Sequence, residues 1–147
     1  RSTLDRSSEA SDVYKRQMLS SQSIEDIMDT IEKLTTTVIG KDPQKWRNFT
    51  SHYSRVFNAN QLDFDRQLNL IIIWLQGANK LRQSLVSGFE RTRLHRRMIS
   101  FNEKFPNANI YKIILCIEEV KALARQNLYM PLILLNMLLD IQELIYE

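Results

Sequence analysis

The chain has 147 residues, about the length of one domain, and is 44% hydrophobic and 25% charged, with three Gly, three Pro, one Cys and two His. This small number of Gly and Pro residues excludes the turn-dense layout of an all-β sandwich, and it also excludes glycine-rich phosphate loops. We therefore expect long helices. The single Cys excludes an internal disulfide and, with two distant His, gives no zinc-ligand spacing. This cysteine usage is typical of a reducing cytoplasm.

The formal net charge of +3 is concentrated in one segment. Residues 80–97 carry six basic side chains and one acidic side chain, whereas the rest of the chain is nearly balanced. The longest apolar run, residues 68–75, is far shorter than the roughly 20 residues that cross a bilayer. The N-terminus also lacks the apolar stretch of a secretory signal. We therefore expect no membrane partner.

Residues 1–17 show no periodic apolar pattern and are rich in Ser, Asp and Arg. Residues 7–17 resemble translated adaptor sequence, so we predict that 1–21 is a disordered, non-native extension and that 22–147 is the folded domain. Two origins stay open. Met18 is a true start, or the chain is the downstream part of a longer protein.

The first two helices are predicted from their caps and spacing. Ser23 is the expected N-cap of a helix whose apolar residues recur at three- and four-residue intervals and which ends at Gly40. Asp42 and Pro43 supply an N-cap and a first-turn proline for a second helix. Polar residues 58–61 close this second helix.

A third helix is predicted from its N-cap Asp63 to about Leu85. Residues 68–75 make it apolar nearly all round, so we expect it at the centre of the molecule. Isoleucines at positions 71–73 also suit a buried strand. The amphipathic continuation of the pattern and the lack of flanking turn residues favour a helix.

Three further helices follow a break at residues 87–88. A short helix begins at Thr92 and is stopped by Pro106, and Asn109 caps a fifth helix that runs to about residue 126. Pro131 opens the last helix. Six helices with short connections predict an all-α fold, an antiparallel bundle of five to six helices. The residues of the last helix expected to face inward are Leu134, Leu135, Leu138, Ile141 and Ile145.

Candidate catalytic groups are few. His52 and His95 have no Ser, Cys or carboxylate at a spacing typical of a nucleophile and its base, and Cys116 is flanked by apolar residues as in a helix core. We therefore predict no catalytic residue, no cofactor and no metal in this chain, and no enzyme activity. The acidic pairs, best explained as caps and solvated helix faces, are Asp63 with Asp65 and Glu118 with Glu119.

The basic segment is the one charged feature that stands out. Six phosphate contacts would make nucleic-acid binding strongly salt-dependent. A solvated helix face, or a surface for an acidic partner, explains the same charges. The segment has almost no aromatic residues on which bases could stack. The possible phosphate contacts are Lys80, Arg82, Arg91, Arg93, Arg96 and Arg97.

Several stretches carry the pattern of a known family. Residues 63–76 read Asp-Phe followed by an apolar run containing Trp, like that family's central helix. Residues 101–106, 125–127 and 134–139 read Phe-Asn-Glu-Lys-Phe-Pro, Arg-Gln-Asn and Leu-Leu-Asn-Met-Leu-Leu. Together these motifs resemble the C-terminal part of the bacterial clamp-loader delta-prime subunits of DNA polymerase III.

The resemblance implies a collar-like helical domain through which clamp-loader subunits join in a ring that loads the sliding clamp during DNA replication. It also implies a bacterial cytoplasmic location, other clamp-loader subunits as partners and an upstream AAA+ ATPase module. Two positions depart from the family pattern. Tyr129 and Met130 stand where the family has Asn-Pro, and Gln76-Gly77 replaces its Arg-Asp pair. The possible subunit-interface residues are Gln76, Arg125, Asn127 and Tyr129.

Two other functions stay open at this point. A small stand-alone helical protein that starts at Met18 would bind nucleic acid, DNA included, through the basic segment 80–97. A helical enzyme with an unrecognised acid-base pair is the third hypothesis. The clamp-loader collar is the leading one, because the family motifs extend over most of residues 22–146.

Overall fold

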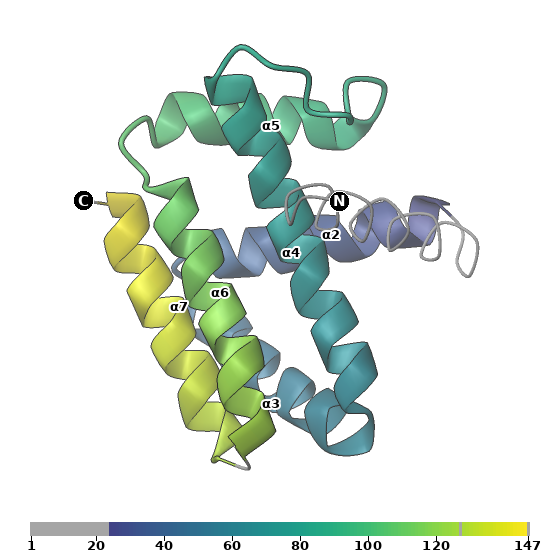
Figure 1. Cartoon of the computed structure of the whole chain (residues 1–147), viewed down its shortest axis with the longest axis vertical. Helices are drawn as coiled ribbons and strands as arrows, with labels where there is room; N and C mark the ends of the chain where they lie inside the picture. The colour runs from purple at the N-terminus through teal and green to yellow at the C-terminus, as the bar shows by residue number, and fades with distance from the viewer. Residues whose placement is uncertain (1–23, 127, 147) are drawn as a thin grey trace, which may run out of the picture.

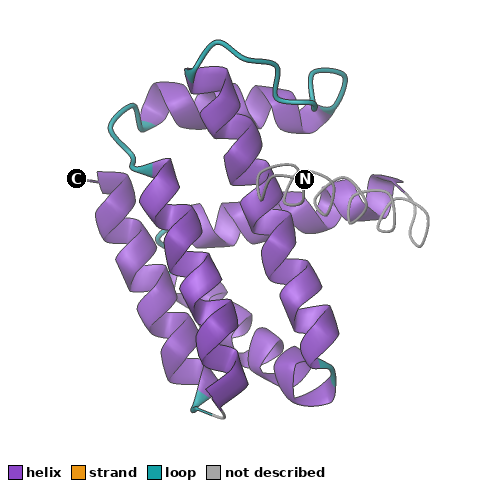
Figure 2. Cartoon of the chain, viewed as in Figure 1, coloured by secondary structure: helices purple, strands orange, loops and turns teal. Residues whose placement is uncertain are grey.

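The computed structural model describes residues 24–126 and 128–146, and these form an all-α bundle with no strand in the described ranges (Figures 1 and 2). This confirms the predicted fold class. The proposed N-terminal extension, the expected cap Ser23 and the interface candidate Asn127 lie outside the described residues. The helices are α2 (Ile24–Ile39), α3 (Pro43–Ala59), α4 (Gln61–Arg82), α5 (Arg93–Lys104), α6 (Ile110–Leu123), the 3₁₀ turn η1 (Ala124–Gln126) and α7 (Met130–Tyr146).

The junction between α2 and α3 follows the predicted local chemistry. The Asp42 side chain accepts a hydrogen bond from the Gln44 amide at 2.9 Å, which confirms Asp42 as the N-cap of α3. The indole Nε1 of Trp46 donates to the carbonyls of Thr37 and Gly40, each at 3.1 Å. These bonds satisfy carbonyls at the end of α2 and set the direction in which α3 leaves it.

Helix α4 is the centre of the molecule, as predicted, and packs against α2, α3, α5 and α6. Its N-cap is Asn60, so the expectation of Asp63 was wrong. The Asn60 side chain accepts from the amides of both Leu62 and Asp63, which leaves Asp63 inside the first turn. The helix also ends earlier than expected, at Arg82. Leu85, placed in the helix by its spacing, follows it and is 54% exposed.

The last three helices confirm two predicted caps and correct two details. Thr92 and Asn109 accept amide hydrogen bonds at the starts of α5 and α6. Helix α6 gives way to a 3₁₀ turn after Leu123. On α7, Leu135 was expected inside but is 39% exposed, and Met137 is buried in its place. The α7 sequence is leucine-rich on several faces, so spacing alone did not identify the buried one.

Figure 1 shows how the helices are arranged. The sequence neighbours α6 and α7 run side by side in opposite directions, with α3 packed behind α7 and α4 beside α6. Helices α2 and α5 run across these, so the antiparallel arrangement applies to only part of the bundle. In the described part of the chain, every helix is too short or too polar to span a bilayer.

Candidate functional site

The six basic residues of the segment 80–97 do not form one surface. Arg82 points into the protein, where its guanidinium donates to the Asn102 side chain and to the backbone carbonyls of Phe105 and Ala108. Burial lowers its pKa, and three acceptors fill most of its hydrogen-bonding capacity. Arg82 therefore joins α4 to the end of α5 and has little left to offer a phosphate.

Arg93 and Arg97 face the acidic side of α2. Arg93 pairs with Asp29 and lies 3.4 Å from a Glu32 carboxylate oxygen, and Arg97 pairs with the other Glu32 oxygen at 3.1 Å. The Arg97 guanidinium also donates to the Thr36 hydroxyl. The Asp29 partner is the main cause that raises the Arg93 pKa. These two cations are partly neutralised within the molecule.

The remaining cations of the segment, Lys80, Arg91 and Arg96, are exposed and have no ion-pair partner among residues 24–126 and 128–146. They come from α4, the α4–α5 connection and α5. Of the six predicted phosphate contacts, half are therefore free to meet a phosphate directly.

The predicted interface residues lie at two ends of the molecule. Arg125 and Tyr129 are exposed at the connection between α6 and α7, and the Tyr129 side chain is 73% exposed. Gln76 is also exposed, but it lies in the last third of α4, which runs toward α5 and away from that connection (Figure 1). The structure brings Arg125 and Tyr129 into one region and leaves Gln76 outside it.

An apolar groove lies between α3 and α7. Tyr129, Pro131, Leu132 and Leu135 form one side, and residues of α3 that include Trp46 form the other. Of these residues, sequence reasoning had singled out only Tyr129 as a functional candidate. The composition of α7 could have indicated this surface, because the helix has more leucines than one buried stripe requires.

The groove continues into a stripe of exposed leucines on α7. Leu132, Leu135 and Leu139 are 54%, 39% and 48% exposed. Their spacing of three and four residues places them on the same helix face, so they form one continuous apolar strip along α7. We call these three residues the leucine stripe. Exposed leucines are common singly, whereas an aligned series beside a groove is typical of an interaction surface.

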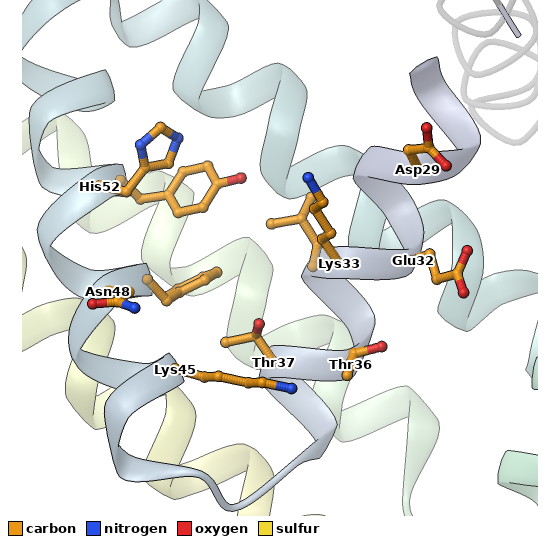
Figure 3. Close-up of a pocket in the computed structure, with 11 residues that line it drawn as sticks. Asp29, Glu32, Lys33, Thr36, Thr37, Lys45, Asn48 and His52 are labelled. Carbon is orange, nitrogen blue, oxygen red and sulfur yellow. The ribbon is translucent and has the colours of Figure 1, made fainter. Parts of the chain in front are cut away.

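A larger cleft, of about 660 Å³, separates α2 from α3 (Figure 3). Leu34, Phe49 and Tyr53 contribute its buried apolar wall. Burial, together with the negative charge of Asp63, raises the pKa of the Tyr53 hydroxyl far above its ordinary value, so Tyr53 is a neutral wall and no general base. The polar side chains that line the cleft from α2 and α3 include Lys33, Thr37, Lys45, Asn48 and His52.

The charges of this cleft are mixed. Asp29 and Glu32 also line it, but Figure 3 shows both on the side of α2 turned away from α3, and both pair with Arg93. His52 stacks edge-on against the Tyr53 ring, with ring centroids 4.7 Å apart. The described residues contain no group of three His, Cys, Asp or Glu side chains that could hold a metal ion. The cleft therefore offers a contact surface of mixed charge.

Cys116 is half-buried on α6. Burial, with the nearby Asp140 and Glu119, raises the pKa of its thiol to about 11. The thiol is thus protonated and weakly nucleophilic near neutral pH.

Comparisons with protein-family models, with curated proteins and with solved structures find no match to this chain. The fold class follows from the structure.

Proposed function

We propose that this chain is a subunit-interaction domain of the clamp-loader collar type, which joins other subunits through α7 and the neighbouring face of α3. The observation that carries the proposal is the leucine stripe on α7, continuous with the α3–α7 groove. The sequence motifs resemble those of the clamp-loader family. The leucine stripe and the groove offer a surface against which a neighbouring subunit packs.

The energetics of this surface favour association. Burying a leucine fully is worth about 1.5–3 kcal/mol, so three half-exposed leucines leave a few kcal/mol of apolar burial to be gained in a complex. A helix from a partner fits such a surface by placing its own apolar residues between the leucines and in the groove. Trp46, which lines the groove, is held by its two hydrogen bonds to the end of α2 and therefore presents a rigid wall.

Tyr129 extends the same surface. It lines the groove beside Pro131 and Leu132, and it was selected from sequence as an interface residue. Tyr side chains are favoured in interfaces because they offer apolar area and a hydroxyl at low entropic cost. Arg125, in the 3₁₀ turn that precedes the same connection, is exposed.

The test is reconstitution with the other subunits of a bacterial clamp loader, followed by size-exclusion chromatography. The unmodified chain should co-elute with at least one of them. Leu135→Ser should weaken this co-elution, and Leu132→Ser with Leu139→Ser together should abolish it. Ile99→Ser is the matched control, because Ile99 on α5 has the same 39% exposure as Leu135 but lies on another helix. Failure of the unmodified chain to join any subunit would count against the proposal.

A second function, nucleic-acid binding, is supported by the three exposed cations Lys80, Arg91 and Arg96. With three direct phosphate contacts, the affinity for duplex DNA should fall with a log–log salt slope of about −3, whereas six contacts would give about −5. A titration at two salt concentrations measures this slope. Binding that ignores salt, or no binding at low salt, would remove this function.

A further inference from the structure

A second pocket, of about 460 Å³, lies where α2 ends, between α5 and the end of α7. Among residues 24–126 and 128–146, its charged lining residues are Lys41, Arg97 and Lys104, and none of the described lining residues is a carboxylate. These three residues come from the α2–α3 connection and from both halves of α5, so the fold brings together cations that are distant in sequence. A concave site with only positive charges attracts anions.

The three cations are held in different ways. Arg97 is positioned by contacts with Glu32 and Thr36. These contacts leave some of the N–H donors of its guanidinium available. Lys41 and Lys104 have no ion-pair partner within residues 24–126 and 128–146. The Lys41 ammonium instead lies 3.7 Å from the centroid of the Tyr146 ring, and that of Lys104 lies 5.4 Å from the centroid of Phe105. Both lysines therefore keep their hydrogen-bond donors available.

Aromatic rings form the wall of the same pocket. Trp74, Phe101, Phe105 and Tyr146 all line it and contact one another in series. The ring centroids are 5.4 Å apart between Trp74 and Phe101, and 5.1 Å apart between Phe105 and Tyr146. Trp74, Phe101 and Phe105 are buried, so the ring that a ligand can reach is that of Tyr146, which is 49% exposed.

Trp74 is the most deeply buried of the four aromatic residues. The Trp74 side chain is 1% exposed, and its indole Nε1 has no hydrogen-bond partner among the described residues. Buried indole N–H groups are usually paired, because leaving one unpaired is costly. The hydroxyl-bearing Ser100 also lines the pocket. The pocket thus combines three cations, a hydroxyl and an exposed aromatic ring, with no acidic residue among the described residues that line it.

We propose that this pocket binds a small molecule in which a planar ring carries a phosphate group, that is, a nucleoside phosphate. The phosphate contacts Lys41, Lys104 and Arg97, and the ring packs against the exposed ring of Tyr146. The cavity volume is in the range of small-molecule sites. This inference does not depend on the proposed assembly surface, which involves the groove between α3 and α7.

The test uses adenosine 5′-monophosphate as the probe, with adenosine and inorganic phosphate as comparison ligands, titrated into the full chain. Calorimetry gives the affinity, and the indole N–H signals in two-dimensional NMR give the place. The Trp74 signal should shift on addition of the nucleotide, whereas the Trp46 signal, whose N–H is already paired, should stay. A Trp46→Phe variant assigns the two signals.

Variants test the cations separately from folding. Lys41→Gln and Lys104→Gln should each weaken nucleotide binding about tenfold, as expected for the loss of one charged contact. Lys33→Gln, a lysine that lines the α2–α3 cleft, should leave the affinity unchanged. Circular dichroism confirms that each variant folds. No saturable binding, binding unchanged in the double lysine variant, or phosphate binding as tightly as the nucleotide would each overturn the proposal.

Discussion

The guanidinium Nε of Arg82 on α4 donates a hydrogen bond to Oδ1 of Asn102 on α5 across 2.8 Å. The Asn102 amide in turn donates to the carbonyl of Ala78, one turn earlier on α4, at 2.9 Å. Arg82 also binds the Phe105 and Ala108 carbonyls in the connection to α6. One arginine therefore holds together α4, α5 and the turn that starts α6.

Replacing this arginine should weaken the fold. We expect Arg82→Met to lower the free energy of unfolding by about 2 kcal/mol, because the Asn102 side chain and two carbonyls lose a charged donor. Urea denaturation followed by circular dichroism measures the change. The control is Lys80→Met, which removes an exposed cation two residues away and should change stability by less than about 0.5 kcal/mol. Equal stability of the two variants would show that the Arg82 contacts contribute nothing.

The ion pairs between α5 and α2 should depend on salt. Arg93→Gln removes the contacts with Asp29 and Glu32, and we expect the variant to be less stable than the unmodified chain at low ionic strength. The difference should shrink at about 1 M salt, where the Debye length is roughly 3 Å. Thermal unfolding at the two salt concentrations checks this. Arg91→Gln, at an exposed arginine without an ion pair, should show no such dependence, and a difference that persists at high salt would contradict the electrostatic explanation.

Cys116 should react slowly with alkylating agents. With its pKa raised from 9.0 to about 11, the thiolate fraction at about pH 8 is roughly a hundredfold lower than for an unperturbed thiol. Mass spectrometry of the chain treated with iodoacetamide measures the rate, and the urea-unfolded chain serves as the reference. Asp140→Asn should raise the rate modestly, since burial is the larger cause of the shift and Asp140 the second. Similar rates for the folded and unfolded chains would refute this account.

The Cys116 thiol also makes the free energy of unfolding depend on pH, and the direction of its pKa shift fixes the direction of that dependence. Between pH 9.0 and about 11, the folded chain keeps the Cys116 proton that the unfolded chain has lost. Since the unfolded state binds fewer protons there, the free energy of unfolding falls as the pH rises through this window. Cys116→Ala should remove this part of the decline in alkaline urea titrations. If the free energy of unfolding falls equally steeply with pH in the unmodified chain and in Cys116→Ala, the thiol does not cause the decline.

Gly77 of α4 packs against the Met98 side chain of α5. A Cβ atom at this position would lie 2.8 Å from Cε and 3.1 Å from Sδ of Met98. The end of a methionine side chain can move, so Gly77→Ala should be nearly neutral, helped by the better helix propensity of Ala. Gly77→Leu should instead destabilise the chain by about 2–3 kcal/mol through overpacking. Met98→Ala should restore part of that loss in the double variant, measured by urea denaturation. Independent, additive effects would show that the two residues do not compete for space.

The position of Gly77 also bears on the family resemblance. The clamp-loader pattern has an Arg-Asp pair where this chain has Gln76 and Gly77. Gly77 is buried against Met98 and Phe89, so a carboxylate there would lack water and a partner. Gln76 is exposed and free to contact another molecule.

Local chemistry made much of the fold predictable. Caps such as Asp42, Thr92 and Asn109 were identified from sequence because the side chain and the amide it binds are two or three residues apart. The central place of α4 followed from its all-round apolar surface. The same local rule misplaced the start of α4, since both Asn60 and Asp63 are suitable caps and only the path of the chain selects one.

The sequence by itself determined that the chain is helical, three of the N-caps and the central position of α4, because these depend on residues within one or two turns of each other. Only the tertiary structure decided that Arg82 binds Asn102 and two carbonyls, that Leu135 is left outside, and that Lys41 and Lys104 line one pocket. Those outcomes depend on the directions in which helices cross. Crossing directions are set by the packing of side chains far apart in the chain, which no local pattern records.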